Sequence, residues 1–128
     1  MSTDAIEKVV ADYFSATRSM DLNAWLATFD KDAISYEPTS ELPLTGYEAL
    51  SQFFQAIAGA FEKVGLTEEQ VFVVGNEAAV KWIGRGVGKN GREIIFEGID
   101  IFEVNPAGKI QKLRAYWNPA AMMAQLQG

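Results

Sequence analysis

The chain contains 128 residues with a formal charge of −6, and it has neither cysteine nor histidine. This composition excludes disulfides, a thiol nucleophile, the usual zinc and non-haem iron ligands and a Ser-His-Asp arrangement, so any acid–base chemistry must use carboxylates, tyrosines or lysines. The negative charge disfavours nucleic acid or an anionic membrane as partner, and with no apolar run of about 18 residues we expect a cytoplasmic protein.

Hydrophobic periodicity predicts that the first half of the chain is helical. Apolar residues recur at helical spacing from Ile6 to Thr17, which predicts an amphipathic helix capped by Asp4 with Glu7 as its capping-box partner. A shorter helix is predicted after Asp21, a suitable N-cap. Its apolar stripe consists of Leu22, Trp25, Leu26 and Phe29.

A short strand and a third helix are predicted next. Residues 33–37 resemble a strand that Pro38 closes, and a loop extends from there to Pro43. The sequence Thr-Gly-Tyr-Glu at 45–48 has the spacing of a capping box. It predicts a helix with the apolar stripe Leu50, Phe53, Phe54, Ile57 and Phe61.

The second half is rich in Val, Ile, Phe and Trp and is predicted to form strands. Asn90-Gly91 indicates a two-residue hairpin, and the turn at 105–108 is slightly longer. Glycines inside the runs, at Gly84, Gly86 and Gly98, indicate bulges or sharp bends. The predicted strands cover about 69–75, 78–88, 92–104 and 109–117.

A final helix is predicted over Ala120–Leu126, after Pro119 and with Asn118 as its cap. Helices followed by long antiparallel strands indicate the α+β class, in which the helices cover one concave face of the sheet. We expect one domain spanning residues 1–128, because the chain is long enough for a single sizeable core.

Asp100 is the most informative residue. Alternate residues of a strand share a face, and in 93–104 Asp100 alone interrupts an apolar face. An ionised carboxylate there would cost several kcal/mol unless paired, so a raised pKa and a neutral, proton-donating acid are favoured. The alternatives are an ion pair with Arg114 or Lys112, or a solvated sheet edge.

Two further polar residues occupy notable positions. Tyr13 lies in the apolar stripe of the first helix, and Glu37 ends the first strand beside Pro38. A tyrosine in such a stripe is often simply a core residue, and a glutamate at a strand end is often solvated. With Asp100 they make three candidates for proton chemistry.

These residues belong to a set of motifs in which the chain resembles the Δ5-3-ketosteroid isomerases of the nuclear transport factor 2-like (SnoaL-like) superfamily. The resemblance extends over essentially the whole chain. Besides the late tyrosine of the first helix, it rests on Asp21-Leu22, Glu37-Pro38, Glu41-Leu42-Pro43-Leu44-Thr45-Gly46, Asn76-Glu77-Ala78-Ala79, Ile99-Asp100-Ile101-Phe102, Ala107-Gly108-Lys109 and Leu113-Arg114-Ala115.

The resemblance implies a cone-shaped, strongly bent, mostly antiparallel sheet with about three N-terminal helices on its concave face. It implies a cofactor-free isomerase that shifts a proton alpha to a carbonyl of a steroid-like or other apolar ketone through an enolate. Tyr13 and a neutral Asp100 would donate hydrogen bonds to the enolate oxygen, and Glu37 would be the base. The same superfold also hosts cyclases, dehydratases and non-catalytic binding modules, which remain alternatives.

The sequence departs from the family pattern at two positions. Glu37 stands where the family has an aspartate, and it is longer by one methylene. Phe54 stands where well-known members have a tyrosine linked to the oxyanion hole.

The resemblance also bears on the ligand and on assembly. An apolar cleft with few polar groups suits an apolar small molecule. Family members usually dimerise through the outer face of the sheet, where Ile95, Ile99 and Ile101 would suit a homodimer interface. The predicted aromatic wall of the cleft consists of Phe54, Trp82, Phe96, Phe102 and Trp117.

Overall fold

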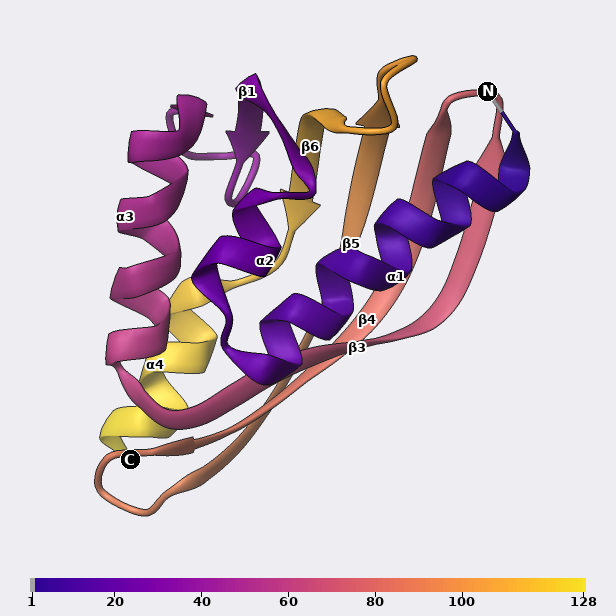
Figure 1. Ribbon diagram of the computed structural model, residues 1–128. Helices are drawn as coiled ribbons and strands as arrows, with labels where there is room; N and C mark the ends of the chain where they lie inside the picture. The colour runs from indigo at the N-terminus through magenta and orange to yellow at the C-terminus, as the bar shows by residue number, and fades with distance from the viewer. Residues whose placement is uncertain (1) are drawn as a thin grey trace.

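The computed structural model describes residues 2–128 and has the predicted α+β architecture (Figure 1). No helix of this part of the chain is both long and apolar enough to cross a membrane. In chain order the elements are α1 (Thr3–Ser19), α2 (Leu22–Leu26), β1 (Phe29–Tyr36), β2 (Leu44–Thr45), α3 (Gly46–Gly59), β3 (Phe61–Val74), β4 (Glu77–Gly88), β5 (Glu93–Val104), β6 (Ile110–Tyr116) and α4 (Pro119–Gln127).

The strands form one mixed sheet in the order β2-β1-β6-β5-β4-β3. Only β1 and β6 pair in parallel within the described sheet, and the other neighbours are antiparallel. Figure 1 shows the long strands β3, β4 and β5 curving beneath α1, while α2 and α3 lie beside them over β1 and β6. The expected bent, mostly antiparallel sheet with N-terminal helices on its inner face is confirmed.

Capping explains where α1 and α2 begin, and it corrects one prediction. The hydroxyl of Ser2 accepts a hydrogen bond from the backbone N–H of Ala5 at 3.1 Å, so Ser2 is the N-cap of α1 and Asp4 lies in the first turn. Asp21 caps α2 as predicted, because its carboxylate accepts from the N–H of Ala24 at 3.0 Å.

The third and fourth helices give one correction and one confirmation. Thr45 occupies the N-cap position of α3, but its side chain makes no capping hydrogen bond, so the predicted capping box does not form. Asn118 caps α4 by accepting from the N–H of Ala121 at 3.0 Å, as expected.

Two strands are longer than their sequences indicated. β1 begins at Phe29 and β3 at Phe61, and both phenylalanines had been assigned to helix stripes. The sequence does not predict the first eight residues of β3, because β3 is the last strand of the sheet and the adjacent exposed charges Glu62 and Lys63 break the alternation of buried and exposed residues. The two-residue strand β2 was not predicted.

The hairpin between β4 and β5 differs from the predicted two-residue turn. The N–H of Gly88 donates to the carbonyl of Arg92 at 2.8 Å, so three residues, 89–91, form the loop. Gly91 has φ 82°, the left-handed conformation that such a three-residue loop requires. The predicted turn at 105–108 is present and has Gly108 at φ 79°.

The strand glycines make room for aromatic rings instead of marking bulges. β4 and β5 pair without a register shift, with Gly98 opposite Trp82 and Gly84 opposite Phe96. A Cβ on either glycine would lie 2.5 Å from the facing ring. The register shifts fall elsewhere, between β3 and β4, between β5 and β6 and between β1 and β6. These glycines therefore fix the positions of two aromatic rings on the inner face of the sheet.

Candidate functional site

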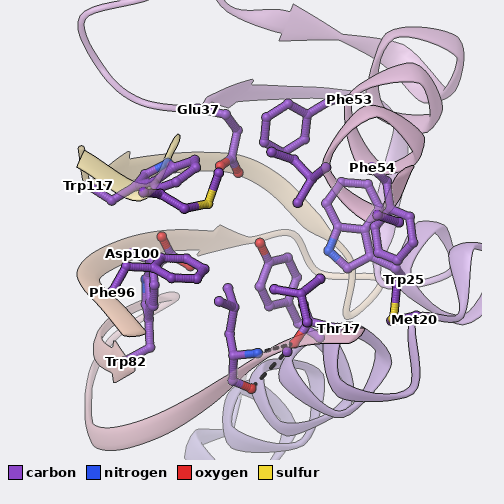
Figure 2. Close-up of a pocket in the computed structure, with 17 residues that line it drawn as sticks. Thr17, Met20, Trp25, Glu37, Phe53, Phe54, Trp82, Phe96, Asp100 and Trp117 are labelled. Carbon is purple, nitrogen blue, oxygen red and sulfur yellow. Dashed lines mark hydrogen bonds between the residues drawn. The ribbon is translucent and has the colours of Figure 1, made fainter. Parts of the chain in front are cut away.

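The inner face of the sheet and the helices enclose an apolar cavity (Figure 2). The volume that the centre of a water molecule can occupy in this cavity is about 80 Å³. On this measure one water needs only about 10–15 Å³, so the cavity can hold several waters or part of a small ligand. The lining is Tyr13, Thr17, Met20, Trp25, Glu37, Phe53, Phe54, Ile57, Ala58, Val64, Gly65, Leu66, Trp82, Phe96, Asp100, Trp117 and Met122.

Few of these residues carry polar side-chain atoms, and one of those serves the fold. The hydroxyl of Thr17 donates to the carbonyl of Phe14 at 2.6 Å and accepts from the N–H of Leu66 at 3.0 Å, which ties α1 to β3. Tyr13, Glu37 and Asp100 remain for chemistry. They come from α1, from the end of β1 and from β5, so the fold brings together all three residues that the sequence predicted.

Asp100 is buried in the middle of the sheet. Its cross-strand neighbours are Val80 on β4 and Ala115 on β6, both apolar, and only 2% of Asp100 is exposed. Burial raises the pKa of Asp100 to about 7, and the nearby Trp82 indole offsets part of this rise. A neutral carboxylic acid is therefore within reach at physiological pH.

The structure excludes the alternative roles considered for Asp100. Its carboxyl forms no ion pair within residues 2–128, and it does not lie at a solvated sheet edge. Arg114, which was one proposed partner, binds Glu103 at 3.0 Å and Glu77 at 3.5 Å on the outer side.

Glu37 follows the last residue of β1 and precedes Pro38 in a cis peptide bond. Figure 2 shows its carboxyl group directed into the cavity. The hydroxyl of Ser35, which is fully buried, donates to Oε1 of Glu37 at 3.0 Å. Burial raises the pKa of Glu37 well above its usual range, the charge of Asp100 raises it further, and the hydrogen bond from Ser35 lowers it. Glu37 is half-buried, and its carboxyl group faces the cavity, in contrast to the solvated alternative.

Tyr13 projects from α1 and is 4% exposed. Its ring packs edge-on against Phe14 and Phe102, at 5.0 and 5.1 Å between ring centroids. Burial raises the pKa of Tyr13 well above its usual value, the charges of Glu37 and Asp100 add to this, and the Trp25 indole lowers it. Tyr13 is thus both a core residue and a protonated phenol at the cavity wall, which makes it a hydrogen-bond donor.

Four of the five residues predicted for the aromatic wall lie at the cavity: Phe54, Trp82, Phe96 and Trp117 line it, whereas Phe102 does not. Phe102 is fully buried and packs edge-on against the rings of Tyr13 and Phe14, so it helps to hold the Tyr13 ring in place. Strand alternation predicts which side of the sheet a residue faces, but it does not distinguish the cavity from the core on that side.

Two tryptophans carry buried polar atoms that no pattern in the sequence indicated. The indole N–H groups of Trp25 and Trp82 are buried and have no hydrogen-bond partner within the described residues. Trp82 was expected in the wall for its ring alone. Trp25 belongs to the predicted apolar stripe of a helix. The only sequence signal for a further role is its indole N–H, which usually needs a hydrogen-bond partner when it is buried.

No group of three or more Asp and Glu side chains in residues 2–128 is arranged to hold a metal ion. The acid–base groups of the cavity are the two carboxyls and the phenol.

Comparison with known proteins identifies the family of this chain. Residues 10–113 match the SnoaL-like domain family. The chain belongs to this family. The steroid Delta-isomerase of Nocardioides simplex is 28% identical over 119 residues, which cover 92% of this chain and 94% of that enzyme. The resemblance to ketosteroid isomerases that the motifs indicated is therefore confirmed.

Solved structures show the same fold. The Δ5-3-ketosteroid isomerase from Mycobacterium sp. has a TM-score of 0.80 at 25% identity, with 92% of this chain and 96% of that chain covered. SalBIII, an epoxide hydrolase/cyclase-like enzyme of pyran ring formation in the polyether salinomycin, has a TM-score of 0.82 at 21% identity, with 91% and 93% covered. Similar folds therefore carry different reactions.

Proposed function

We propose that this SnoaL-like protein is a cofactor-free isomerase that moves a proton from a carbon alpha to a carbonyl, through an enolate, to another carbon of the same substrate. The observation that carries the proposal is the convergence of Glu37, Asp100 and Tyr13 in a cavity that is otherwise apolar. The 28% identical steroid Delta-isomerase, which aligns over almost its whole length, supports this choice of reaction. The substrate class is a steroid-like or other apolar ketone.

Each of the three residues has one role in the reaction. The carboxylate of Glu37 takes the alpha proton, and the electron pair of the broken C–H bond moves onto the carbonyl oxygen. Tyr13 and neutral Asp100 donate hydrogen bonds to that oxygen as its charge develops. Glu37 then returns the proton to a different carbon, so neither a cofactor nor a net change of atoms is needed. Loss of one such donor typically reduces the rate by about 10²–10³-fold.

The electrostatics of the cavity suit this sequence of steps. Two carboxyls in one apolar site resist a double charge, so the favoured state holds one negative charge shared between them. The hydrogen bond from Ser35 lowers the pKa of Glu37 and so stabilises the ionised form that acts as the base, against the larger effect of burial. When Glu37 takes the proton, the charge moves to the enolate oxygen beside Tyr13 and Asp100. The total charge of the cavity stays constant, and no new charge has to be buried.

A cyclase or dehydratase of the same family is the second candidate. The raised pKa of Glu37 favours a protonated carboxyl, which would act as a general acid on an epoxide or hydroxyl oxygen. The fold shared with SalBIII is compatible with such a reaction. A non-catalytic binding module for apolar small molecules is the third, and it would use the same cavity without turnover.

The pH dependence of turnover separates these functions. For the isomerase, kcat/KM with an apolar β,γ-unsaturated ketone rises with pH as the Glu37–Asp100 pair loses its first proton, and it falls again at higher pH when the pair loses its second proton. For a general-acid enzyme with an epoxide substrate, the rate falls over the same pH range. A binding module turns over neither substrate at any pH.

Glu37→Gln tests the base directly. We expect this variant to lose isomerase activity and to keep its affinity for a planar phenol, because Glu37 does not donate to the oxyanion. Full activity in Glu37→Gln would remove this residue from the mechanism. Glu37→Asp then tests the departure from the family: a faster enzyme would show that the shorter side chain is better placed, and a large loss that the site is built around glutamate.

A further inference from the structure

The Trp25 indole N–H is an unsatisfied donor in the wall of the cavity. Trp25 is 2% exposed, and its Nε1 has no hydrogen-bond partner within residues 2–128. A buried donor without a partner is destabilising, and most such groups in folded proteins are satisfied. Figure 2 shows the Trp25 nitrogen turned toward the interior of the cavity. An acceptor placed there would satisfy it.

The fold holds this indole in a fixed position. Phe29 and Phe54 pack against the Trp25 ring, at 4.8 and 4.9 Å between ring centroids. The Tyr13 ring lies on another side at 5.9 Å. The indole is also close enough to the Tyr13 hydroxyl to lower the pKa of that phenol. The N–H of Trp25 and the O–H of Tyr13 therefore lie at neighbouring points of the cavity wall.

We propose that the Trp25 indole N–H is a third hydrogen-bond donor of the ligand site and donates, beside the Tyr13 hydroxyl, to an oxygen of the bound ligand. The inference rests on the proposed function only in identifying this oxygen as the enolate oxygen. Phe54 contributes no hydroxyl at the cavity wall, and the N–H of Trp25, which packs on Phe54, supplies a donor in the same region. The ligand class is an apolar, ring-containing molecule with an oxygen that can carry negative charge.

The two indoles of the cavity whose N–H groups lack a partner within residues 2–128 differ in what lies next to them. The Trp82 indole lies near the Asp100 carboxyl, a hydrogen-bond acceptor whose pKa it lowers. The neighbour of Trp25 is the Tyr13 phenol, whose O–H is itself a donor to the cavity. A ligand oxygen between the two groups would accept from the phenol and the indole together.

Removal of the N–H without a change of ring shape tests the proposal. Trp25 is replaced by β-(3-benzothienyl)alanine, in which sulfur takes the place of the N–H group, and Trp25→Phe serves as a second, genetically encoded variant. Binding of 2-naphthol, whose oxygen resembles that of a dienolate, is compared with binding of naphthalene, which lacks the oxygen. We expect the replacement to weaken naphthol binding by about 10-fold or more and naphthalene binding by less than about 2-fold.

Trp117 provides the matched control, because it lines the same cavity and its N–H is not a buried group without a partner. The same replacement at Trp117 should leave the ratio of naphthol to naphthalene affinity unchanged. The proposal is overturned if the replacement at Trp25 leaves naphthol binding intact, if it weakens both ligands equally, or if Trp117 shows the same selective loss.

The same measurements in the Glu37→Gln background keep the two proposals apart. With Glu37 neutral, as it is after proton transfer, the selective loss of naphthol affinity should persist. If no ketone is turned over but this pattern holds, the isomerase proposal fails and Trp25 remains a ligand donor. If a ketone is turned over but the pattern is absent, the isomerase proposal stands without Trp25.

Discussion

The charge of Asp100 raises the pKa of Glu37, although the two residues lie on β5 and at the end of β1 and are far apart in the sequence. The coupling follows from a shared apolar cavity, where water screens charges poorly. Each carboxyl thus controls how readily the other holds its proton.

The first prediction uses this coupling. Asp100→Asn removes the negative charge that Asp100 carries when it is ionised, so the pKa of Glu37, measured by NMR titration of its carboxyl group, should fall. The activity should fall as well, because an amide is a weaker donor than a carboxylic acid. A Glu37 pKa that is unchanged or higher in the variant would contradict the coupling.

The second prediction concerns Ser35. Its hydroxyl donates to Glu37 at 3.0 Å and lowers the pKa of that carboxyl, so Ser35→Ala should raise it. The rise of kcat/KM should then move to higher pH, while the rate at high pH stays close to that of the wild type. Ser40→Ala, at an exposed loop position, is the control and should have the wild-type profile. An unchanged profile in Ser35→Ala would show that this hydrogen bond does not tune the base.

Strand periodicity and the family resemblance together predict much of the site. Asp100 can be found from the sequence because strand alternation has a period of two, so a single charged residue on an otherwise apolar face is easily recognised. The meeting of Glu37 with Asp100 was inferred from the family alone, since no local pattern links the end of β1 to the middle of β5. Trp25 was expected only in the apolar stripe of a helix but lines the cavity, whereas Phe102 was expected at the cavity but lies in the core. Periodicity separates the inner from the outer side of an element, but it does not separate cavity from core.

The edges of the sheet were the least predictable part of the fold. The first half of β3 carries adjacent exposed charges that break its period, and the two-residue β2 is too short to show any period. Pairing with β4 and with β1 determines these strands. Such pairing is a tertiary effect that propensity does not record.

The third prediction tests the role of Gly98. A Cβ at this position would lie 2.5 Å from the Trp82 ring and 2.7 Å from the Tyr116 carbonyl, so Gly98→Ala must displace the indole or the backbone. We expect a loss of about 1–3 kcal/mol in the free energy of unfolding, measured by denaturant melts, and weaker ligand binding. Gly59→Ala is the matched control, because a Cβ there meets nothing within 4 Å, and it should be neutral or stabilising. Equal stability of the two variants would show that the Trp82 side chain can move away from position 98 at little energetic cost.

The fourth prediction concerns assembly. Ile95 and Ile99 are 53% and 42% exposed on the outer face of β5, and Tyr116, paired with Ile99 on β6, is 51% exposed. Contiguous apolar patches of several hundred Å² are rare on soluble monomers, so we propose a homodimer through this face. Sedimentation should show a dimer at micromolar concentration, and Ile99→Lys should shift it to monomer. Val74→Lys, at an exposed apolar position at the end of β3, should remain dimeric. A monomeric wild-type protein would contradict the proposal.

The last prediction follows from the burial of Asp100 and needs no substrate. The pKa of Asp100 is about 7 in the folded chain, against about 3.9 when unfolded. Below pH 4 both states hold the proton, so ionisation of this group does not affect stability. Between pH 4 and 7 only the unfolded chain ionises, and each pH unit removes about 1.4 kcal/mol from the free energy of unfolding. Above pH 7 both states are ionised and the loss is complete.

Asp100→Asn cannot ionise and therefore escapes this loss. It should be more stable than the wild type at pH 7.5, by up to about 4 kcal/mol, and equally stable near pH 4. Denaturant melts at the two pH values measure the difference, and the exposed Asp32→Asn serves as the control that should leave the pH dependence unchanged. The amide still donates a hydrogen bond, so Asp100→Asn should also keep more activity than Asp100→Ala. An Asp100→Asn protein that is less stable than the wild type at pH 7.5 would mean that the folded chain stabilises the ionised carboxylate, and Asp100 would then not be a neutral donor.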